Sequence, residues 1–100
     1  MKNINKIPTL GEIKLIAIPI LQRYGATRTG VFGSIATGQI HQRSDIDVLV
    51  DFGQPLGLFD FVGLKLELQK ALGRNVDLVE YAAIKPLLRE RILAEQVSIL

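Results

Sequence analysis

Apolar residues recur at helical spacing in two long stretches of the chain. From Thr9 to Tyr24 they fall three or four positions apart, which predicts a helix with one buried face. We expect Pro19 to end or kink this helix and Gly25 to stop it. The same spacing from Leu58 to Leu72 predicts a second long helix, closed by Gly73.

Three shorter runs, rich in β-branched and apolar residues, predict strands at Thr27–Phe32, Ile46–Phe52 and Asn75–Glu80. A tight turn of small residues, 33–38, and a polar loop, 39–44, join the first two strands. This connection has no helical period and is short for a parallel crossover. The sheet is therefore expected to be mixed.

A last helix is predicted from Pro86, which suits a first helical turn, through Leu93. The resulting order of elements predicts an α/β (α+β) fold in which helices cover a small mixed sheet. One hundred residues supply one core, so the whole chain, 1–100, is expected to form a single domain.

The second long helix carries more apolar residues than one sheet face requires. Phe59, Val62 and Leu66 are surplus to a sufficient core stripe, which comprises Leu58, Phe61, Leu64, Leu68 and Leu72. The surplus is consistent with contact to a partner or a second copy of the chain, and equally with burial in a larger core.

Composition narrows the chemistry that the chain can perform. Apolar residues make up 48% and charged residues 22%, as in ordinary globular domains. The net charge of +2 comes from scattered basic residues and does not indicate a nucleic-acid partner. Without cysteine, a metal site would use carboxylates or the single His41, and oxygen ligands favour Mg or Mn. No signal peptide or run of ~20 apolar residues is found, so a cytoplasmic protein is expected.

Asp45 and Asp47 stand at the start of a predicted strand. Two residues apart in a strand, they would project from the same face, about 6.6 Å apart at the backbone. Carboxylates this close repel each other unless a cation lies between them, and paired divalent ions serve in-line phosphoryl displacement. Taken alone, the pair is more typical of two exposed acids at a strand entrance.

Gly33 and Ser34 follow a strand and precede small residues up to Gly38. Glycine lets backbone amides approach a phosphate, and the serine hydroxyl adds a donor. For Gly-Ser alone, a plain strand-to-loop turn is the better explanation. Neither the lysine of a P-loop nor the crossover helix of a dinucleotide site follows.

In combination these motifs are specific. Gly33-Ser34, Gly38 and the run Ser44-Asp45-Ile46-Asp47 resemble the signature of polymerase-beta-type nucleotidyltransferases, specifically the minimal nucleotidyltransferases. The resemblance extends through the helix closed by Gly73 and the strand that contains Asp77, and so covers nearly the whole chain.

The resemblance implies roles for the matching residues. The Gly33-Ser34 turn would hold the nucleotide triphosphate, and Ser44 is also assigned to nucleotide binding. Asp45, Asp47 and Asp77 would be the catalytic acids that bind Mg (or Mn), with ATP as the substrate. Asp77 also interrupts an apolar strand, where an unpaired carboxylate is costly to bury. The alternative for Asp77 is an edge-strand acid that faces water.

Other polar residues fit the pattern less closely. Thr37 stands where members of the family often carry an arginine, and Arg28, Arg43 or a partner's side chain could replace that charge. His41 is more typical of an exposed loop histidine. A solvated helix face is the better explanation for Lys85, Arg89 and Arg91.

Stand-alone minimal nucleotidyltransferases of this size resemble the antitoxins of two-gene systems, which transfer adenylate to a tyrosine of a helical HEPN toxin. The resemblance therefore implies a protein adenylyltransferase that acts as an antitoxin, in complex with such a partner or with a second copy. One alternative is a catalytically silent antitoxin that neutralises its partner by covering it. The presence of all three acids argues against this alternative. Another is an enzyme that modifies a small molecule, which the lack of a second domain disfavours.

Overall fold

A four-stranded mixed sheet forms the centre of the structure, a computed structural model that describes residues 7–41 and 43–100. Its strands β1 to β4 lie in the order β3-β2-β1-β4. β1 is antiparallel to β2 and β4, whereas β2 is parallel to β3, so the expected mixed sheet is confirmed. The strands span Ala26–Phe32 (β1), Ile46–Phe52 (β2), Val76–Glu80 (β3) and Val97–Ser98 (β4).

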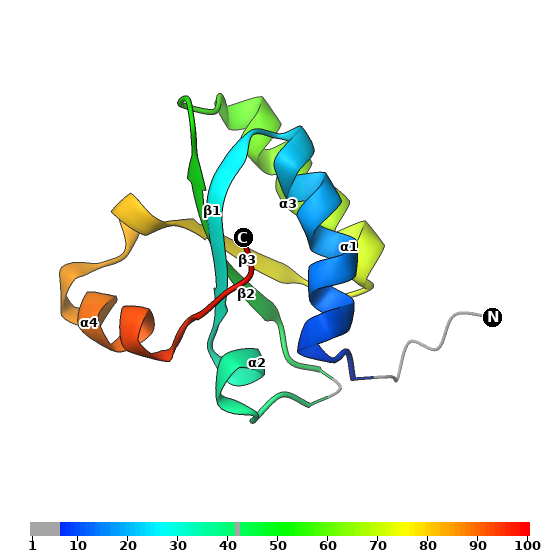
Figure 1. Ribbon diagram of the computed structural model, residues 1–100, viewed down its shortest axis with the longest axis vertical. Helices are drawn as coiled ribbons and strands as arrows, with labels where there is room; N and C mark the ends of the chain where they lie inside the picture. Colours follow the sequence, from blue (N-terminus) through cyan, green and yellow to red (C-terminus); the bar gives the residue numbers. More distant parts are fainter. Residues whose placement is uncertain (1–6, 42) are drawn as a thin grey trace.

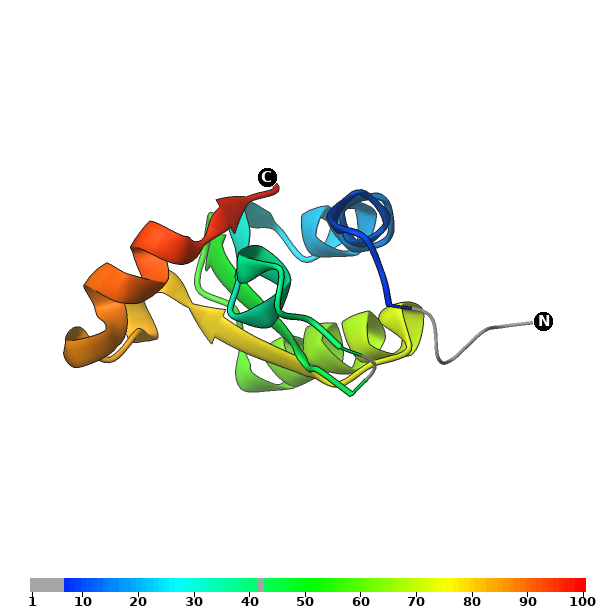
Figure 2. The same cartoon turned by 90° about the horizontal axis from the view of Figure 1, so that it is seen from below.

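Helices cover the two faces of this sheet unequally. α1 (Leu10–Arg23) and α3 (Leu58–Leu72) lie beside each other on one face, and α4 (Pro86–Glu95) lies on the other side (Figures 1 and 2). Alternation along each strand divides the apolar side chains between the faces. Ile46, Val48 and Val50 of β2 join the larger core under α1 and α3, whereas Leu49 packs with Tyr81 on the α4 side.

The first helix begins as its sequence predicts. Thr9 caps α1: its hydroxyl accepts a hydrogen bond from the Glu12 amide at 3.1 Å, and the Glu12 carboxylate accepts one from the Thr9 amide at 3.0 Å. Of the two expectations for Pro19, an end or a kink of the helix, the end is wrong, because α1 continues through Pro19 to Arg23. Burial of Ala17 and Leu21 on either side of Pro19 compensates for the lost hydrogen bond.

Four further details differ from the sequence prediction. The turn after β1 contains a short helix, α2 (Ser34–Thr37), and a 3-10 turn, η1 (Tyr81–Ala83), precedes α4. β4 was not predicted, because two residues carry no detectable period. Leu58 was assigned to the core but is 78% exposed, since it occupies the first turn of α3, at the end of the sheet. None of the helices in the described part of the chain is long and apolar enough to cross a membrane.

Candidate functional site

The Gly33-Ser34 turn lies directly against Asp47. Gly33 follows β1 with φ of 69° and ψ of −145°, a positive-φ conformation that favours glycine. A Cβ atom added to Gly33 would lie 2.2 Å from Oδ2 of Asp47, which is closer than any real contact. A side chain at Gly33 would therefore displace the Asp47 carboxylate from its position. The predicted turn and one of the predicted acids are brought together.

Asp47 also faces the third predicted acid. Asp47 and Asp77 are direct partners in the parallel pairing of β2 with β3, so their side chains share the face of the sheet that α4 partly covers. Asp45 precedes the first residue of β2 and is exposed. Burial, together with repulsion from Asp77 and then from Asp45, raises the pKa of Asp47 to about 6. A negative site thus forms at one end of the sheet.

Two expectations about these acids need correction. Asp45 lies just before the strand and not within it, so strand alternation does not fix its direction. Asp77 is exposed on β3, which is an edge strand, so the argument from the cost of burial does not apply to it. Asp47 is the partly buried member, and it carries the raised pKa.

The acids suit a hard divalent cation by their chemistry. Carboxylate oxygens are the ligands that Mg and Mn prefer, and a cation would relieve the repulsion that raises the pKa of Asp47. Among residues 7–41 and 43–100, however, no three acidic or histidine side chains already converge on one point.

A cleft of about 350 Å³ opens beside the Gly33-Ser34 turn. Its wall contains Thr37 and Gln39 from the same segment, and Arg91 and Glu95 from α4. The Nε atom of Arg91 lies 3.4 Å from a Glu95 carboxylate oxygen. Arg91 was assigned to a solvated helix face. Its place in this cleft depends on how α4 packs, which no local sequence pattern reveals.

A second, mostly apolar cleft of about 310 Å³ has Asp77 in its wall. α4 forms part of its wall with Leu88 and Ile92, and Lys85 stands at the start of the same helix. Phe32 and Val79 contribute from β1 and β3. Asp77 is thus an acid in the wall of an apolar hollow, and α4 contributes side chains to this hollow and to the Gly33 cleft.

Several other predicted residues have partners of their own. The Ser44 hydroxyl accepts a hydrogen bond from the His41 amide at 2.9 Å, and the His41 ring nitrogen Nδ1 accepts one from the Arg43 amide at 3.2 Å. Arg74 donates to the carbonyl oxygens of His41 and Ser44 and so holds this loop.

Arg28 stacks on the Tyr81 ring, 4.0 Å from its centroid. Because Arg28 lies near the start of β1, whereas Gly33 follows its end, it does not line the Gly33 cleft.

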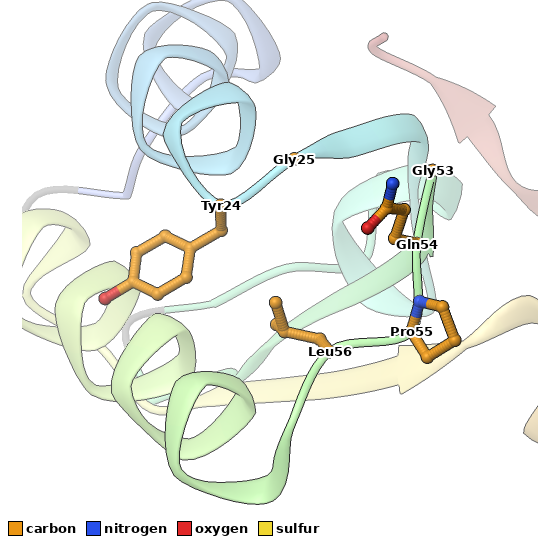
Figure 3. A pocket seen from close by; sticks show the side chains of 6 residues that line it. All are labelled: Tyr24, Gly25, Gly53, Gln54, Pro55 and Leu56. Carbon is orange, nitrogen blue, oxygen red and sulfur yellow. The ribbon is translucent and has the colours of Figure 1, made fainter.

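A further cleft, of about 520 Å³, lies at the opposite end of the strands, between the segment before β1 and the one after β2 (Figure 3). Gly25, Gly53 and Leu56 line it, and no charged side chain does. The Tyr24 ring points toward α3, where its hydroxyl donates to Glu67 at 3.2 Å. The acids and this cleft are therefore separate features.

Comparison with known proteins supports the resemblance. The model of the family described as "Nucleotidyltransferase domain" matches residues 16–99. A Methanocaldococcus jannaschii protein, provisionally named a protein adenylyltransferase, is 47% identical over 91 residues, which are 91% of this chain and 98% of that protein. Protein adenylyltransferase MntA of Thermococcus cleftensis is 36% identical over 95 residues, with coverage of 91% and 96%.

Solved structures share the fold. A chain in the crystal structure of a toxin-antitoxin with AMP-PNP superimposes with a TM-score of 0.77 at 25% identity, over 87% of this chain and 72% of that one. A structure of a tri-AMPylated Shewanella oneidensis HEPN toxin in complex with an MNT antitoxin gives a TM-score of 0.69 at 21% identity, over 88% and 69%, and so shows the fold alone. The family match and the relatives show that this chain belongs to the nucleotidyltransferase domain family, with the fold of its minimal, polymerase-beta-like members, and is a nucleotidyltransferase.

Proposed function

We propose that this nucleotidyltransferase transfers adenylate from ATP, with Mg or Mn, to a tyrosine hydroxyl of a HEPN-type partner and so acts as its antitoxin. The observation that carries the proposal is the contact of the Gly33 backbone with Asp47, which is itself paired with Asp77. Nucleotidyl transfer needs a phosphate-binding turn next to acids that could hold a divalent cation, because such a cation would neutralise phosphate charge close to the attacking oxygen.

Each residue has a distinct part in this proposal. Amides of the turn at Gly33 and Ser34 receive the triphosphate, and Ser44 stays a predicted contributor to nucleotide binding. Asp45, Asp47 and Asp77 would hold the divalent ions, which neutralise phosphate charge and lower the pKa of the acceptor hydroxyl. The tyrosine oxygen attacks the α-phosphorus as the bond to pyrophosphate breaks. Asp77, exposed beside the apolar cleft, accepts the hydroxyl proton.

The nature of the partner is supported by the comparisons. Relatives that align over most of this chain carry the name protein adenylyltransferase, and a structure with the same fold contains an AMPylated HEPN toxin. The structure adds an exposed apolar row on α3, where Phe59 is 95%, Leu66 56% and Val62 44% accessible. Because these three side chains are exposed, they are not buried in a larger core of this chain. A contact with another protein accounts for them better.

The direct test is mass spectrometry of a co-expressed HEPN-type partner. An added adenylate on a tyrosine, absent when Asp47→Asn replaces the parent, is the expected result. If the partner is neutralised but never modified, the chain is a binding antitoxin. If only a small molecule accepts adenylate, the partner assignment is wrong.

A further inference from the structure

The cleft beside Gly33 contains a positive charge that the family motif does not supply. Arg91 belongs to α4 and follows Asp47 by more than forty residues, yet it lines the same cleft as the Gly33-Ser34 turn and Thr37. No other lysine or arginine in the described part of the chain lines this cleft. Its guanidinium is the donor best able to bind phosphate oxygens there.

The ion pair of Arg91 leaves it available. Glu95 contacts it through Nε at 3.4 Å, and the two side chains are 76% and 34% exposed. An exposed pair of this kind, one helical turn apart, is weakly held and exchanges readily for a stronger anion. The contact through Nε also leaves both terminal nitrogens of the guanidinium for a phosphate.

We propose that Arg91 binds the β- and γ-phosphates of the nucleotide and supplies the positive charge of this cleft. The inference rests on the proposed function, because it takes the Gly33 turn as the phosphate site. Thr37 is exposed in the wall of the same cleft, so an arginine placed there would reach the same space. An arginine at either position, 37 or 91, would therefore place a positive charge in this cleft. An arginine at position 37 should then rescue the loss of Arg91.

Calorimetry with AMP-PNP and with AMP, in the presence of Mg, separates the contribution of the β- and γ-phosphates from that of the rest of the nucleotide. Arg91→Gln is expected to weaken AMP-PNP binding about tenfold or more, the effect of losing a charge-assisted hydrogen bond, and to leave AMP binding unchanged. Thr37→Arg in the Arg91→Gln background should restore most of the loss. Lys14→Gln, which removes an exposed charge from α1, should change neither ligand's affinity.

The outcomes distinguish the inference from the function on which it rests. If Gly33→Val binds AMP-PNP as well as the parent does, the turn is not the phosphate site and the proposed function fails. If Gly33→Val loses binding but Arg91→Gln does not, Arg91 is not a phosphate ligand and the proposed function stands. An equal loss for AMP and AMP-PNP, or no recovery with Thr37→Arg, would also overturn the assignment of Arg91 to the β- and γ-phosphates.

Discussion

Asp47 and Asp77 are direct partners across the parallel strands β2 and β3. Parallel neighbours lie about 4.8 Å apart, so this pairing holds two carboxylates on one face without an intervening strand. Burial of Asp47 and repulsion from Asp77 both oppose ionisation of Asp47, whose pKa rises to about 6. In the absence of a cation, this arrangement lowers the free energy of unfolding, and the size of the loss depends on pH.

The first prediction concerns that dependence. Because the folded-state pKa of Asp47 lies above the ordinary value of 3.8, the folded chain binds this proton more tightly than the unfolded chain does. In metal-free buffer the Asp47 contribution to the free energy of unfolding should therefore fall as pH rises from about 4 through about 6. Asp47→Asn should lack this contribution. Urea unfolding of both proteins from pH 4 to pH 8 measures the difference, and parallel pH profiles would contradict the prediction.

The second prediction isolates the contact between Gly33 and Asp47. Gly33→Ala and Gly25→Ala both place a side chain at positive φ, at 69° and 84°, which costs about 1–2 kcal/mol. Only the first also places a Cβ against the Asp47 carboxylate, since nothing lies within 4 Å of a Cβ at Gly25. Gly33→Ala should therefore lose more stability and most transfer activity, whereas Gly25→Ala should keep its activity. Equal activity in the two variants would show that the contact does not matter for transfer.

The third prediction concerns the exposed row on α3. Phe59→Asp should leave the free energy of unfolding nearly unchanged, because 95% of Phe59 is already in solvent. It should weaken association with the HEPN-type partner or with a second copy, which sedimentation of the co-expressed complex would show. Leu64→Ala is the contrasting control: Leu64 is fully buried, so this change should cost about 2–5 kcal/mol of stability. An unaltered complex with Phe59→Asp would exclude α3 from the interface.

The sequence predicts the parts of this molecule that depend on local periodicity. β2 begins and ends where its apolar run does, and α3 ends at Gly73, whose φ of 68° gives the left-handed cap expected there. The sequence also predicts that Gly33 lies near Asp47, because both residues belong to one motif that spans a short stretch of the chain. Arg91 could not be assigned, because its role depends on the packing direction of α4, a helix with no residue buried deeply enough to reveal it.

The exposure of Leu58 and the pairing of β4 were unpredictable for a related reason. Periodicity indicates which face of a helix is apolar, but not how far the sheet beneath it extends. Leu58 lies in the first turn of α3 and is 78% exposed, although it fits the helical stripe. Val97 and Ser98 become a strand only because β1 presents a free edge to them.

The last prediction concerns the acids and separates an enzyme from a binding protein. Asp→Asn keeps the size of the side chain but removes the charge that binds a cation. We expect Asp47→Asn and Asp77→Asn each to lower the rate of adenylate transfer by about a hundredfold or more. Folding should survive, because Asp77 is exposed and the loss of either carboxylate relieves repulsion.

The double variant should be little slower than either single variant, because groups that act as one unit fail together. Asp60→Asn provides the matched control, since Asp60 is an exposed acid in the first turn of α3, away from the Asp47–Asp77 pair. Transfer to the partner and neutralisation of the partner should be measured on the same samples. If transfer is lost but neutralisation persists at full strength, the biological role is binding. If transfer survives in both single variants, the two aspartates are not the catalytic acids.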